Sequence, residues 1–483
     1  MSGTSHQEEP EGWARQQFGA ATLSDVRRVR RAVRIAEAMA TKPGGSLPQL
    51  FTTPYAVKAA YTFFRHAEAS PDRLQAGHRE GVQQALQQRG EYLLLEDTTT
   101  MVWSGASPRD GLGPIGDTQT RQEGFHLHTT LAVRWLPEGR KEDKGRRPAV
   151  EVVGVCDQQY WVREPQPRHG RHVSSLQRKK RPRESQVWEQ AGQRIGAAPR
   201  RRDVRWVRVG DRGADIYEHL QKCQELGHGF VVRAAQDRAL LEAASGRKEG
   251  RLFSVARTLP ALGEFGLELR GRPTQPARRA RLQVGARRIC LGAPQRPGHK
   301  QGSQPPIPCT VIWVREIEPP LGVVPLEWIL LVDVEVPTFA QALQCVLQYA
   351  TRWIIEEYHK ALKSGLGAER LQLETAAGLM AAIAIMSIVA LRLLALRERG
   401  RESPDAAAEE AGLTPLELEV LRLKTRGKLP TVREVALALG RLGGHLNRRR
   451  DGMPGWQTLW RGMNTLRGLV EGVQLARQLA KFG

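Results

Sequence analysis

The pattern of apolar and polar positions predicts two short helices near the start of the chain. The first covers residues 25–39, with Ser24 as its N-cap, and a second helical stretch follows Thr53-Pro54. The first helix carries five arginines: Arg27, Arg28, Arg30, Arg31 and Arg34. A charge run on a single helix is commonly no more than a solvated face. Two short helices with five arginines fit a DNA-binding module about as well, so the pattern alone leaves both interpretations open.

Between residues 76 and 370 the pattern changes to alternating strands and helices, which is typical of an α/β fold. We expect strands at 92–96, 127–135, 149–155 and 204–209. A helix should follow Gly210-Asp211 and end near Gly227. Farther on, short apolar runs alternate with turns rich in Gly, Pro and Arg, and we expect strands at 230–233, 281–284, 288–291 and 310–314. This stretch, about 230–315, is predicted to be an all-β insertion.

The last part of the chain, residues 371–483, has helical periodicity throughout. Capping boxes at Thr414-Pro-Leu-Glu417 and Thr431-Val-Arg-Glu434 mark the starts of two helices. The stretch 379–396 is very apolar, but its uncharged part ends at Arg392 and is shorter than the about 20 residues that a spanning helix needs. We therefore expect a buried core helix there, and three domains in all: 1–75, 76–370 and 371–483.

Charge changes this picture, because 73 Lys and Arg stand against 51 Asp and Glu and give a net charge of +22. Such a surface attracts nucleic acid or anionic lipid. The first residues lack the basic and apolar regions of a secretory signal. The five cysteines are odd in number, far apart and without a C-x-x-C pair, which argues against a zinc finger or a disulfide framework. These features indicate a reduced, intracellular, soluble protein.

The segment 349–363 carries the most informative side chains. At about 100° per residue, one helix face holds apolar residues for the core. The other face combines Glu356 with cations and aromatics, namely Tyr349, Arg352, Trp353, Lys360 and Lys363. Periodicity alone says only that the helix is amphipathic. A carboxylate can bind a divalent metal, however, and Arg, Lys and Tyr can hold phosphate oxygens, so this mixture suits phosphoryl transfer on a nucleic-acid backbone.

Two aspartates, Asp97 and Asp211, each follow an apolar strand. A lone aspartate at a strand end is more often a turn or cap residue than a ligand. Together with Glu356, the pair could hold two Mg²⁺ ions about 4 Å apart, and Mn²⁺ could substitute for them. No Walker A sequence is present and no G-x-G-x-x-G follows a strand, so we expect no nucleotide cofactor.

The sequence resembles bacterial DDE transposases of the IS-four family. The signature Y-x-x-R-x-x-x-E-x-x-x-x-x-x-K is complete from Tyr349 to Lys363. Other matching stretches are Trp13–Ala38, Ala60–Arg65, Leu93–Thr99, Asp211–Ile216, Phe230–Arg233, Gly367–Arg370 and Arg441–Gly444. The basic loop 163–183 and the stretch 405–420 have no close match.

The resemblance implies a ribonuclease-H-like catalytic core with an inserted β-sheet subdomain, between an N-terminal helical domain that recognises DNA ends and a C-terminal helical domain for dimerisation. It implies that Asp97, Asp211 and Glu356 are the catalytic, metal-binding triad. Phosphate contacts are implied for Tyr349, Arg352 and Lys363, and a base-stacking role for Trp328. We also expect DNA contacts from Trp353, Lys360, Arg233 and the arginines of the 25–39 helix.

The family cuts one strand with water and then uses the freed 3′-OH to form a hairpin on the opposite strand. A second water opens the hairpin, and the 3′ ends are joined to target DNA. We therefore expect a cut-and-paste transposase that binds double-stranded DNA, both transposon ends and target, as a homodimer, in the bacterial cytoplasm near the nucleoid and without a membrane partner. A nuclease of the same fold and a non-catalytic DNA-binding derivative are the alternatives; the intact triad argues against the second.

Overall fold

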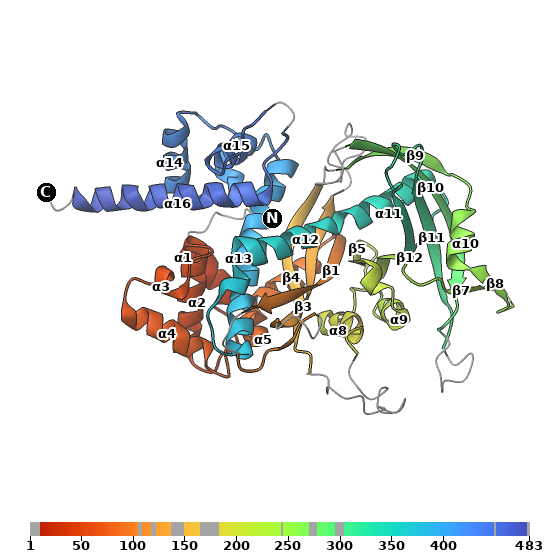
Figure 1. Ribbon diagram of the computed structural model, residues 1–483, viewed down its shortest axis with the longest axis horizontal. Helices are drawn as coiled ribbons and strands as arrows, with labels where there is room; N and C mark the ends of the chain where they lie inside the picture. Colours follow the sequence, from red (N-terminus) through yellow and green to blue (C-terminus); the bar gives the residue numbers. More distant parts are fainter. Residues whose placement is uncertain are drawn as a thin grey trace.

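The computed structural model describes most of the chain. The described residues are 10–104, 109–116, 122–136, 149–164, 183–242, 245–269, 278–294, 304–448 and 451–480. Within them the fold is mixed α/β, with helices gathered at both ends of the chain around one large sheet (Figure 1). The α/β class predicted from the sequence is confirmed at this level.

The sheet has 12 strands among the described residues and mixes parallel with antiparallel pairs. At its centre β1 (Gly90–Trp103), β5 (Val204–Gly210) and β6 (Gly229–Arg233) run parallel to one another. The order along the sheet is β2-β3-β1-β5-β6-β12-β11-β10-β7-β8, with β4 paired to β3 and β9 to β10. The remaining strands are β2 (Gly113–Pro114), β3 (Glu123–Leu136), β4 (Ala149–Trp161), β7 (Ala239–Leu241), β8 (Lys248–Arg251), β9 (Gly263–Leu269), β10 (Arg278–Leu291), β11 (Ile307–Glu316) and β12 (Glu327–Val332).

Helices cover both faces of this sheet. Successive side chains of a strand point to opposite faces, and on the central strands both sets are mainly apolar and buried. On β1, Leu93 and Leu95 belong to the core shared with α11 (Phe339–Thr351) and α12 (Trp353–Lys360). Leu94 points to the opposite face, where four other helices supply the core residues. These helices are α6 (Ala76–Leu86), α8 (Gln186–Ile195), α9 (Tyr217–Glu225) and α10 (Leu252–Arg257).

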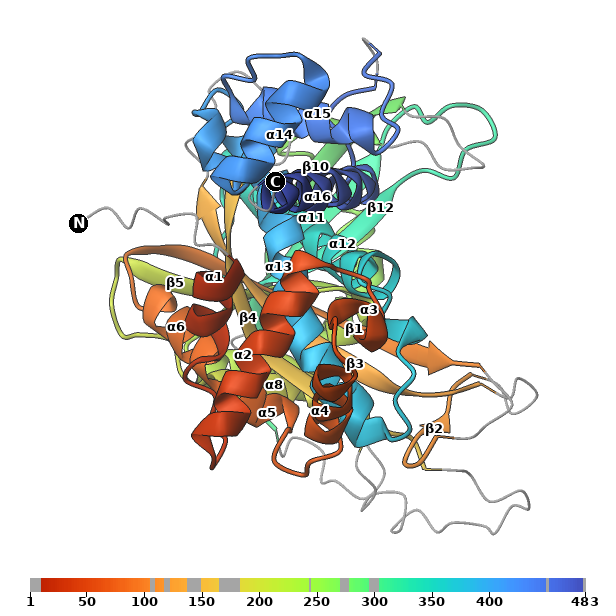
Figure 2. The same ribbon diagram turned by 90° about the vertical axis from the view of Figure 1, so that its left-hand side faces the viewer.

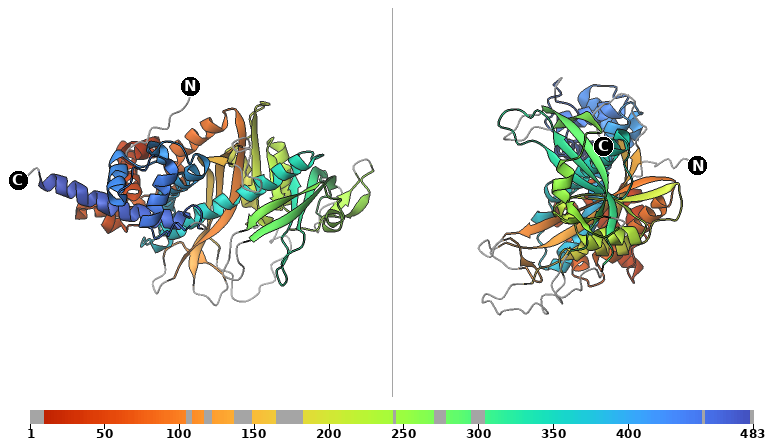
Figure 3. Two further views of the ribbon diagram at one scale, coloured as in Figure 1. Left: turned by 90° about the horizontal axis from the view of Figure 1, so that it is seen from above. Right: turned by 90° about the vertical axis from the view of Figure 1, so that its right-hand side faces the viewer.

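A long apolar helix, α13 (Ala376–Glu402), joins the two ends of the chain (Figures 1 and 2). The N-terminal helices α1 (Pro10–Phe18), α2 (Val26–Thr41), α3 (Leu47–Leu50), α4 (Pro54–Phe64) and α5 (Pro71–Leu74) gather on one side of it. The C-terminal helices α14 (Pro415–Thr425), α15 (Val432–Leu442) and α16 (Trp456–Leu479) gather on the other, and the end of α16 extends away from the body (Figure 3).

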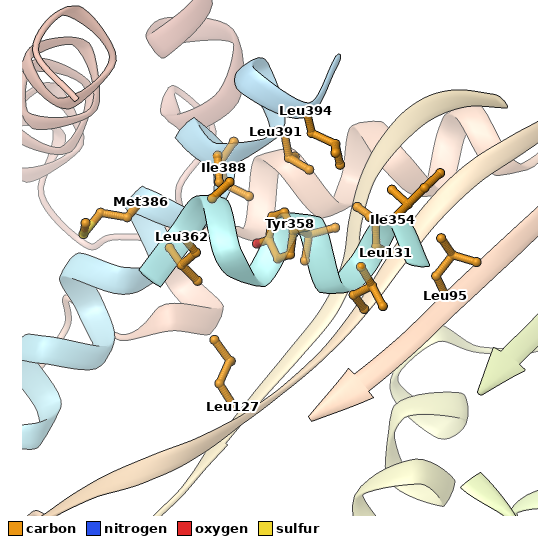
Figure 4. Packing of buried hydrophobic residues seen from close by; sticks show 14 of the residues in the cluster. Leu95, Leu127, Leu131, Ile354, Tyr358, Leu362, Met386, Ile388, Leu391 and Leu394 are labelled. Atoms are coloured by element: carbon orange, nitrogen blue, oxygen red, sulfur yellow. The ribbon is translucent and has the colours of Figure 1, made fainter. Parts of the chain in front are cut away.

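By length and composition, α13 is the one helix among the described residues that could cross a membrane. Three quarters of its most apolar window is buried inside the protein. The expected core helix is therefore observed. Figure 4 shows how α13 contributes to that core: Ile388 and Leu391 lie beside Tyr358 of α12 and Leu362 of the π-helical turn after it, with Leu131 of β3 below them.

Several local predictions differ from the structure. Asp25, not Ser24, caps α2, because its side chain accepts from the Arg27 amide while the Ser24 hydroxyl donates to Glu68. The strand predicted to end before Asp97 continues to Trp103, because β3 pairs with β1 over that whole length. The two strands predicted within 281–291 are one strand, β10.

The segment predicted as a separate all-β insertion also differs. It contains helix α10, and its strands continue the central sheet through the pairing of β12 with β6. Of the basic loop 163–183, residues 165–182 lie outside the described part of the chain. Arg163, at its start, forms an ion pair with Glu184 near its end.

Candidate active site

Two parallel strands bring Asp97 and Asp211 to the same edge. The pairing of β1 with β5 ends at Leu95 opposite Val209. Asp97 and Asp211 each come two residues after that pair, so they share its register and its face. Leu95 and Val209 lie in the core beneath α11 and α12. Asp211 therefore follows the end of β5 beside Asp97, on the face that α12 covers, while β1 continues past Asp97 in its pairing with β3.

Helix α12 carries Glu356 over this edge. Ile354, Ile355 and Tyr358 anchor the helix in the core, so the predicted apolar face is observed over this turn (Figure 4). Glu356 lies on the other side of α12 and is partly exposed. The predicted single helix 349–363 is interrupted: α11 ends at Thr351, Arg352 joins it to α12, and a π-helical turn follows at Ala361–Gly365.

Arg352 lies between two of the three carboxylates. One guanidinium nitrogen is 3.8 Å from Asp97 Oδ2, and the other pairs closely with Glu356 Oε1. Asp97 also lies 3.7 Å from Nδ1 of His359 and accepts a hydrogen bond of 2.9 Å from the Thr98 amide. Burial alone would raise the pKa of Asp97, but His359, Arg352 and the Thr98 amide outweigh it, and the net pKa is lowered. Asp97 is therefore ionised at neutral pH.

The third carboxylate, Asp211, is turned toward its own backbone. Its Oδ1 accepts from the Gly213 amide at 2.8 Å and so caps a short 3₁₀ turn. The next aspartate, Asp215, has a structural role, because it accepts from the amides of Ala235 and Gln236, each at 2.7 Å, and pairs with Arg238. Of the two aspartates in the stretch Asp211–Ile216, only Asp211 is therefore a candidate to act with Asp97 and Glu356.

The described residues contain no group of three or more His, Cys, Asp or Glu side chains gathered in metal-binding geometry. The predicted triad is thus brought to one edge and one face but is not gathered into a metal centre, since Arg352 and the Gly213 amide engage its oxygens. The donor set still fits a hard divalent cation, which prefers carboxylate oxygens and keeps several waters. Asp97, Asp211 and Glu356 are the residues that would supply those oxygens.

The expected phosphate-binding lysines flank this site in different ways. Lys363 donates to the Thr100 carbonyl at 2.9 Å and pairs with Glu369 at 3.0 Å, so its charge is compensated within the protein. Lys360 is more exposed, and its ammonium lies 4.5 Å from the ring centroid of Trp353. That ring is itself exposed, and its nitrogen donates to Glu357 at 3.0 Å. Lys360 and Trp353 thus form a cation–π pair at the surface of α12.

Tyr349 is buried rather than exposed beside Arg352. It packs edge-to-face against Trp328, with ring centroids 5.3 Å apart. Trp328 lies on β12, which is separated from β1 by β5 and β6, or about 14 Å at the usual strand spacing. Arg233 also lies on this side of the sheet, where it donates to the Glu327 carbonyl at 2.9 Å. The expected DNA-contacting residues therefore form two groups, one on α12 and one around Trp328.

The arginines of α2 differ in their partners and in their exposure. Arg27 pairs with Asp25 at 3.2 Å, and Arg28 pairs with Glu68. Arg30 and Arg34 are exposed, and Arg31 is partly exposed. Helix α2 buries Ile35 and Ala36 against the core, so the basic face predicted from the sequence does point outward.

Three neighbours of the site were not foreseen from the sequence. His359 contacts Asp97, Glu369 holds Lys363, and Glu96 forms a buried ion pair directly behind Asp97. All three lie within stretches that match the family, namely Leu93–Thr99, Tyr349–Lys363 and Gly367–Arg370, which were the available signals. The partners of His359 and Glu96 come from distant strands, which spacing along the chain does not show.

Family models match three parts of the chain. Residues 10–69 match a transposase DNA-binding domain, residues 185–392 a transposase DDE domain, and residues 388–483 the dimerisation domain of the Tn5 transposase. The DDE match contains Asp211 and Glu356, and Asp97 lies before it. A DDE domain implies a ribonuclease-H-like core and the use of divalent metal ions. The protein is therefore a DDE transposase, a DNA-cleaving and strand-transferring enzyme with its own DNA-binding and dimerisation domains.

Proposed function

We propose that this transposase works by a cut-and-paste route of the IS-four type, with Asp97, Asp211 and Glu356 as its catalytic carboxylates. The observation that carries the proposal is the shared edge: two aspartates in register on neighbouring parallel strands, with a glutamate above them on the helix that covers that face. Two divalent ions, Mg²⁺ or Mn²⁺, held by these carboxylates would activate the attacking oxygen and stabilise the leaving oxygen.

The cations around the triad are the proposed phosphate contacts. Arg352 now compensates Asp97 and Glu356, and Lys363 compensates Glu369. A DNA phosphate brought to this edge offers both cations a stronger acceptor, and Arg352 can meet it with two parallel donors. Arg352 and Lys363 would then orient the scissile phosphate, while Lys360 and Trp353 contact the strand beside it.

The route includes a hairpin. Water cleaves one strand, the freed 3′-OH attacks the opposite strand, and a second water opens the hairpin before the 3′ ends are joined to target DNA. The hairpin bend requires a base to leave the stack, at a cost of a few kcal/mol. Trp328, held on its edge by Tyr349, would offset that cost by stacking on the base. Arg233, which donates to the carbonyl of Glu327 next to Trp328, would contact the adjacent DNA backbone.

The flanking parts of the chain would assemble the complex. Helix α2 presents Arg30, Arg31 and Arg34 for the transposon end, and residues 388–483 would pair two protomers. The projecting end of α16 exposes Leu475 and Leu479, which suits a second protomer. The three proposed domains, 1–75, 76–370 and 371–483, then recognise ends, catalyse and dimerise on DNA in the bacterial cytoplasm, near the nucleoid.

The experiment is a cleavage and joining assay on paired transposon ends, taken from the DNA that flanks the reading frame. Wild-type protein with Mg²⁺ should give nicks, hairpins and joined products. Glu356→Gln should give none of them while binding the ends normally. The exposed Glu335→Gln, in the loop between β12 and α11, is the matched control and should cleave normally. Loss of end binding by Glu356→Gln would contradict the catalytic assignment.

The hairpin step has its own variant. Trp328→Ala should slow hairpin formation by about tenfold, a loss of about 1.4 kcal/mol of stacking, with less effect on the first nick. Equal slowing of nicking and hairpin formation would contradict a stacking role for Trp328.

A further inference from the structure

Behind Asp97, on the opposite face of the sheet, lies a fully buried ion pair. Glu96 of β1 and Arg208 of β5 are both inaccessible to solvent. Arg208 Nε donates to Glu96 Oε2 at 2.9 Å, and its Nη2 pairs closely with Glu96 Oε1. The hydroxyl of Thr130 donates to Glu96 at 3.0 Å, and Arg208 Nη2 donates to the Trp188 carbonyl at 2.6 Å. The pair therefore connects β1, β3, β5 and α8.

The Glu96–Arg208 pair lies close to Asp97 and Asp211 along the two strands. The backbone pairing of β1 with β5 stops at Leu95 and Val209. Glu96 is the next residue of β1 and directly precedes Asp97, whereas Arg208 is three residues before Asp211. This side-chain link thus joins the two strands where their backbone pairing ends, directly beside Asp97 within β1 and just before β5 gives way to Asp211.

The guanidinium also supports the turn of Asp211 through α8. A Cβ on Gly192 would lie 2.3 Å from Arg208 Nη1, so the glycine leaves the space that the guanidinium fills. The ring of Trp188, whose carbonyl Arg208 holds, lies 3.3 Å from the position of a Cβ on Gly213. Gly213 is the residue whose amide donates to the side chain of Asp211. One arginine thus fixes both the β1 side and the β5 side of the carboxylate edge.

The chemistry of the pair favours a geometric role over a stabilising one. Burying two charges costs desolvation energy that their attraction seldom repays, and a well-packed apolar pair is often as stable. A planar guanidinium, however, holds a carboxylate through two parallel bonds at a set angle, which neither lysine nor an apolar side chain can do. A strand position behind a catalytic aspartate is where such directionality matters.

We propose that Arg208, through Glu96 and Trp188, is a positioning residue that sets the spacing of Asp97 and Asp211. The proposal rests on the proposed role of these two aspartates as metal ligands. Arg208 does not touch DNA or metal, because it lies wholly inside the protein. Its effect should appear in how tightly the carboxylate edge holds a divalent ion and how fast the enzyme cuts, with no effect on binding of DNA ends.

The test compares full-length wild type with the double variant Glu96→Leu/Arg208→Met, which removes both charges and leaves none unpaired. We expect its Tm to stay within about 5 °C of wild type. Its end binding should be unchanged, its cleavage rate should fall at least about tenfold, and the rise in Tm that Mn²⁺ produces should require several-fold more Mn²⁺. The matched control is Glu316→Leu/Arg278→Met, an ion pair between a buried glutamate of β11 and a partly exposed arginine of β10, four strands beyond β5 in the sheet order. It should cut, and respond to Mn²⁺, like wild type.

Arg208→Lys keeps the charge without the planar fork and serves if the double variant does not fold. It too should need more Mn²⁺ and cut more slowly than wild type. Wild-type rates and Mn²⁺ dependence in either folded variant would overturn the positioning role, as would an equal loss in the Glu316/Arg278 control. Asp97→Asn, run beside them, separates the two ideas: if it cuts normally, the proposed triad fails and the positioning role fails with it. If it is inactive while the double variant is normal, only the positioning role fails.

Discussion

Successive residues of one strand, Glu96 and Asp97, carry the same charge into opposite environments. Glu96 is fully buried and is bound by Arg208 and Thr130. Asp97 is partly exposed, and its neighbours Arg352 and His359 lie 3.8 and 3.7 Å away. The strand alternation alone separates them. On one face of the sheet, Glu96 is thus fixed in a buried ion pair. On the other face, Asp97 can exchange its present partners for others.

The difference shows how this fold reconciles a rigid frame with a reactive edge. A buried carboxylate must be fully paired, since an unpaired charge inside a protein is very costly. A partly exposed carboxylate can give up its partner for water, metal or a rearranged side chain at low cost. We therefore expect single substitutions at the exposed carboxylate to lower catalysis with little loss of stability, and a single substitution that leaves a charge unpaired on the buried face to lower stability.

The largest effect should come from Asp97→Asn. If Asp97 holds a metal ion as proposed, removing its charge should lower the cleavage rate at least about 1,000-fold. The free energy of unfolding should change by less than about 1 kcal/mol, because the side chain is partly exposed and its ion contacts are long. Cleavage of labelled ends and urea unfolding measure the two quantities. A loss of several kcal/mol in the free energy of unfolding would mean that Asp97 has a structural role instead of a catalytic one.

In contrast to Asp97→Asn, Glu96→Leu should lower the free energy of unfolding strongly. It leaves the guanidinium of Arg208 buried without its carboxylate, which should lower the free energy of unfolding by about 3–5 kcal/mol. Restoring neutrality with Arg208→Met in the same chain should recover most of that loss. Urea unfolding at pH 7.5 checks both steps. A single variant within about 1 kcal/mol of wild type would mean that the pair is not the buried anchor described above.

The buried histidine His78 of α6 should make the free energy of unfolding depend on pH. Its Nε2 accepts from the Val155 amide at 3.0 Å and its Nδ1 is 2.6 Å from Gln17, so the folded protein holds the neutral ring. Burial, with a smaller contribution from Arg79, lowers its pKa to about 3. The unfolded chain takes up this proton below about pH 6.5 and the folded protein does not, so stability falls as the pH is lowered through that range.

From pH 7.5 to 5 this histidine should contribute about 2 kcal/mol to the loss in free energy of unfolding. His78→Gln should remove that part of the pH dependence, whatever its effect on stability at pH 7.5. His66→Gln, on the exposed loop after α4, is the control and should leave the pH profile unchanged. Identical profiles for wild type and His78→Gln would contradict a buried neutral ring.

The smallest effect should come from an exposed ion pair with good geometry. Arg281 of β10 is 2.9 Å from Glu264 of β9, but more than a third of each side chain is exposed. Arg281→Gln should change the free energy of unfolding by less than about 0.5 kcal/mol, because solvent and salt screen the pair. A large loss here would mean that pairing, and not burial, separates Glu96 from the exposed carboxylates.

Local patterns were enough for much of the fold. The capping boxes at Thr414 and Thr431, the helix after Thr53 and the strand before Asp211 are all observed, because each depends on neighbours within a few residues. The ends of β1 and the shape of segment 281–291 were not predictable, because the partner strand decides how far a strand extends. Ser24 was taken for a cap because the choice between it and Asp25 depends on Glu68, far along the chain.

The sequence by itself determined which residue types are present at the reactive edge: Asp97, Asp211 and Glu356, with a cationic helix around the last. It could not determine that Arg352 lies between two of them, that Tyr349 is buried against Trp328, or that Glu96 has a guanidinium partner. Those contacts depend on the register of β1 on β5 and on the packing of α12. Periodicity is a property of neighbours along the chain, whereas register and packing arise only when distant segments fold onto one another.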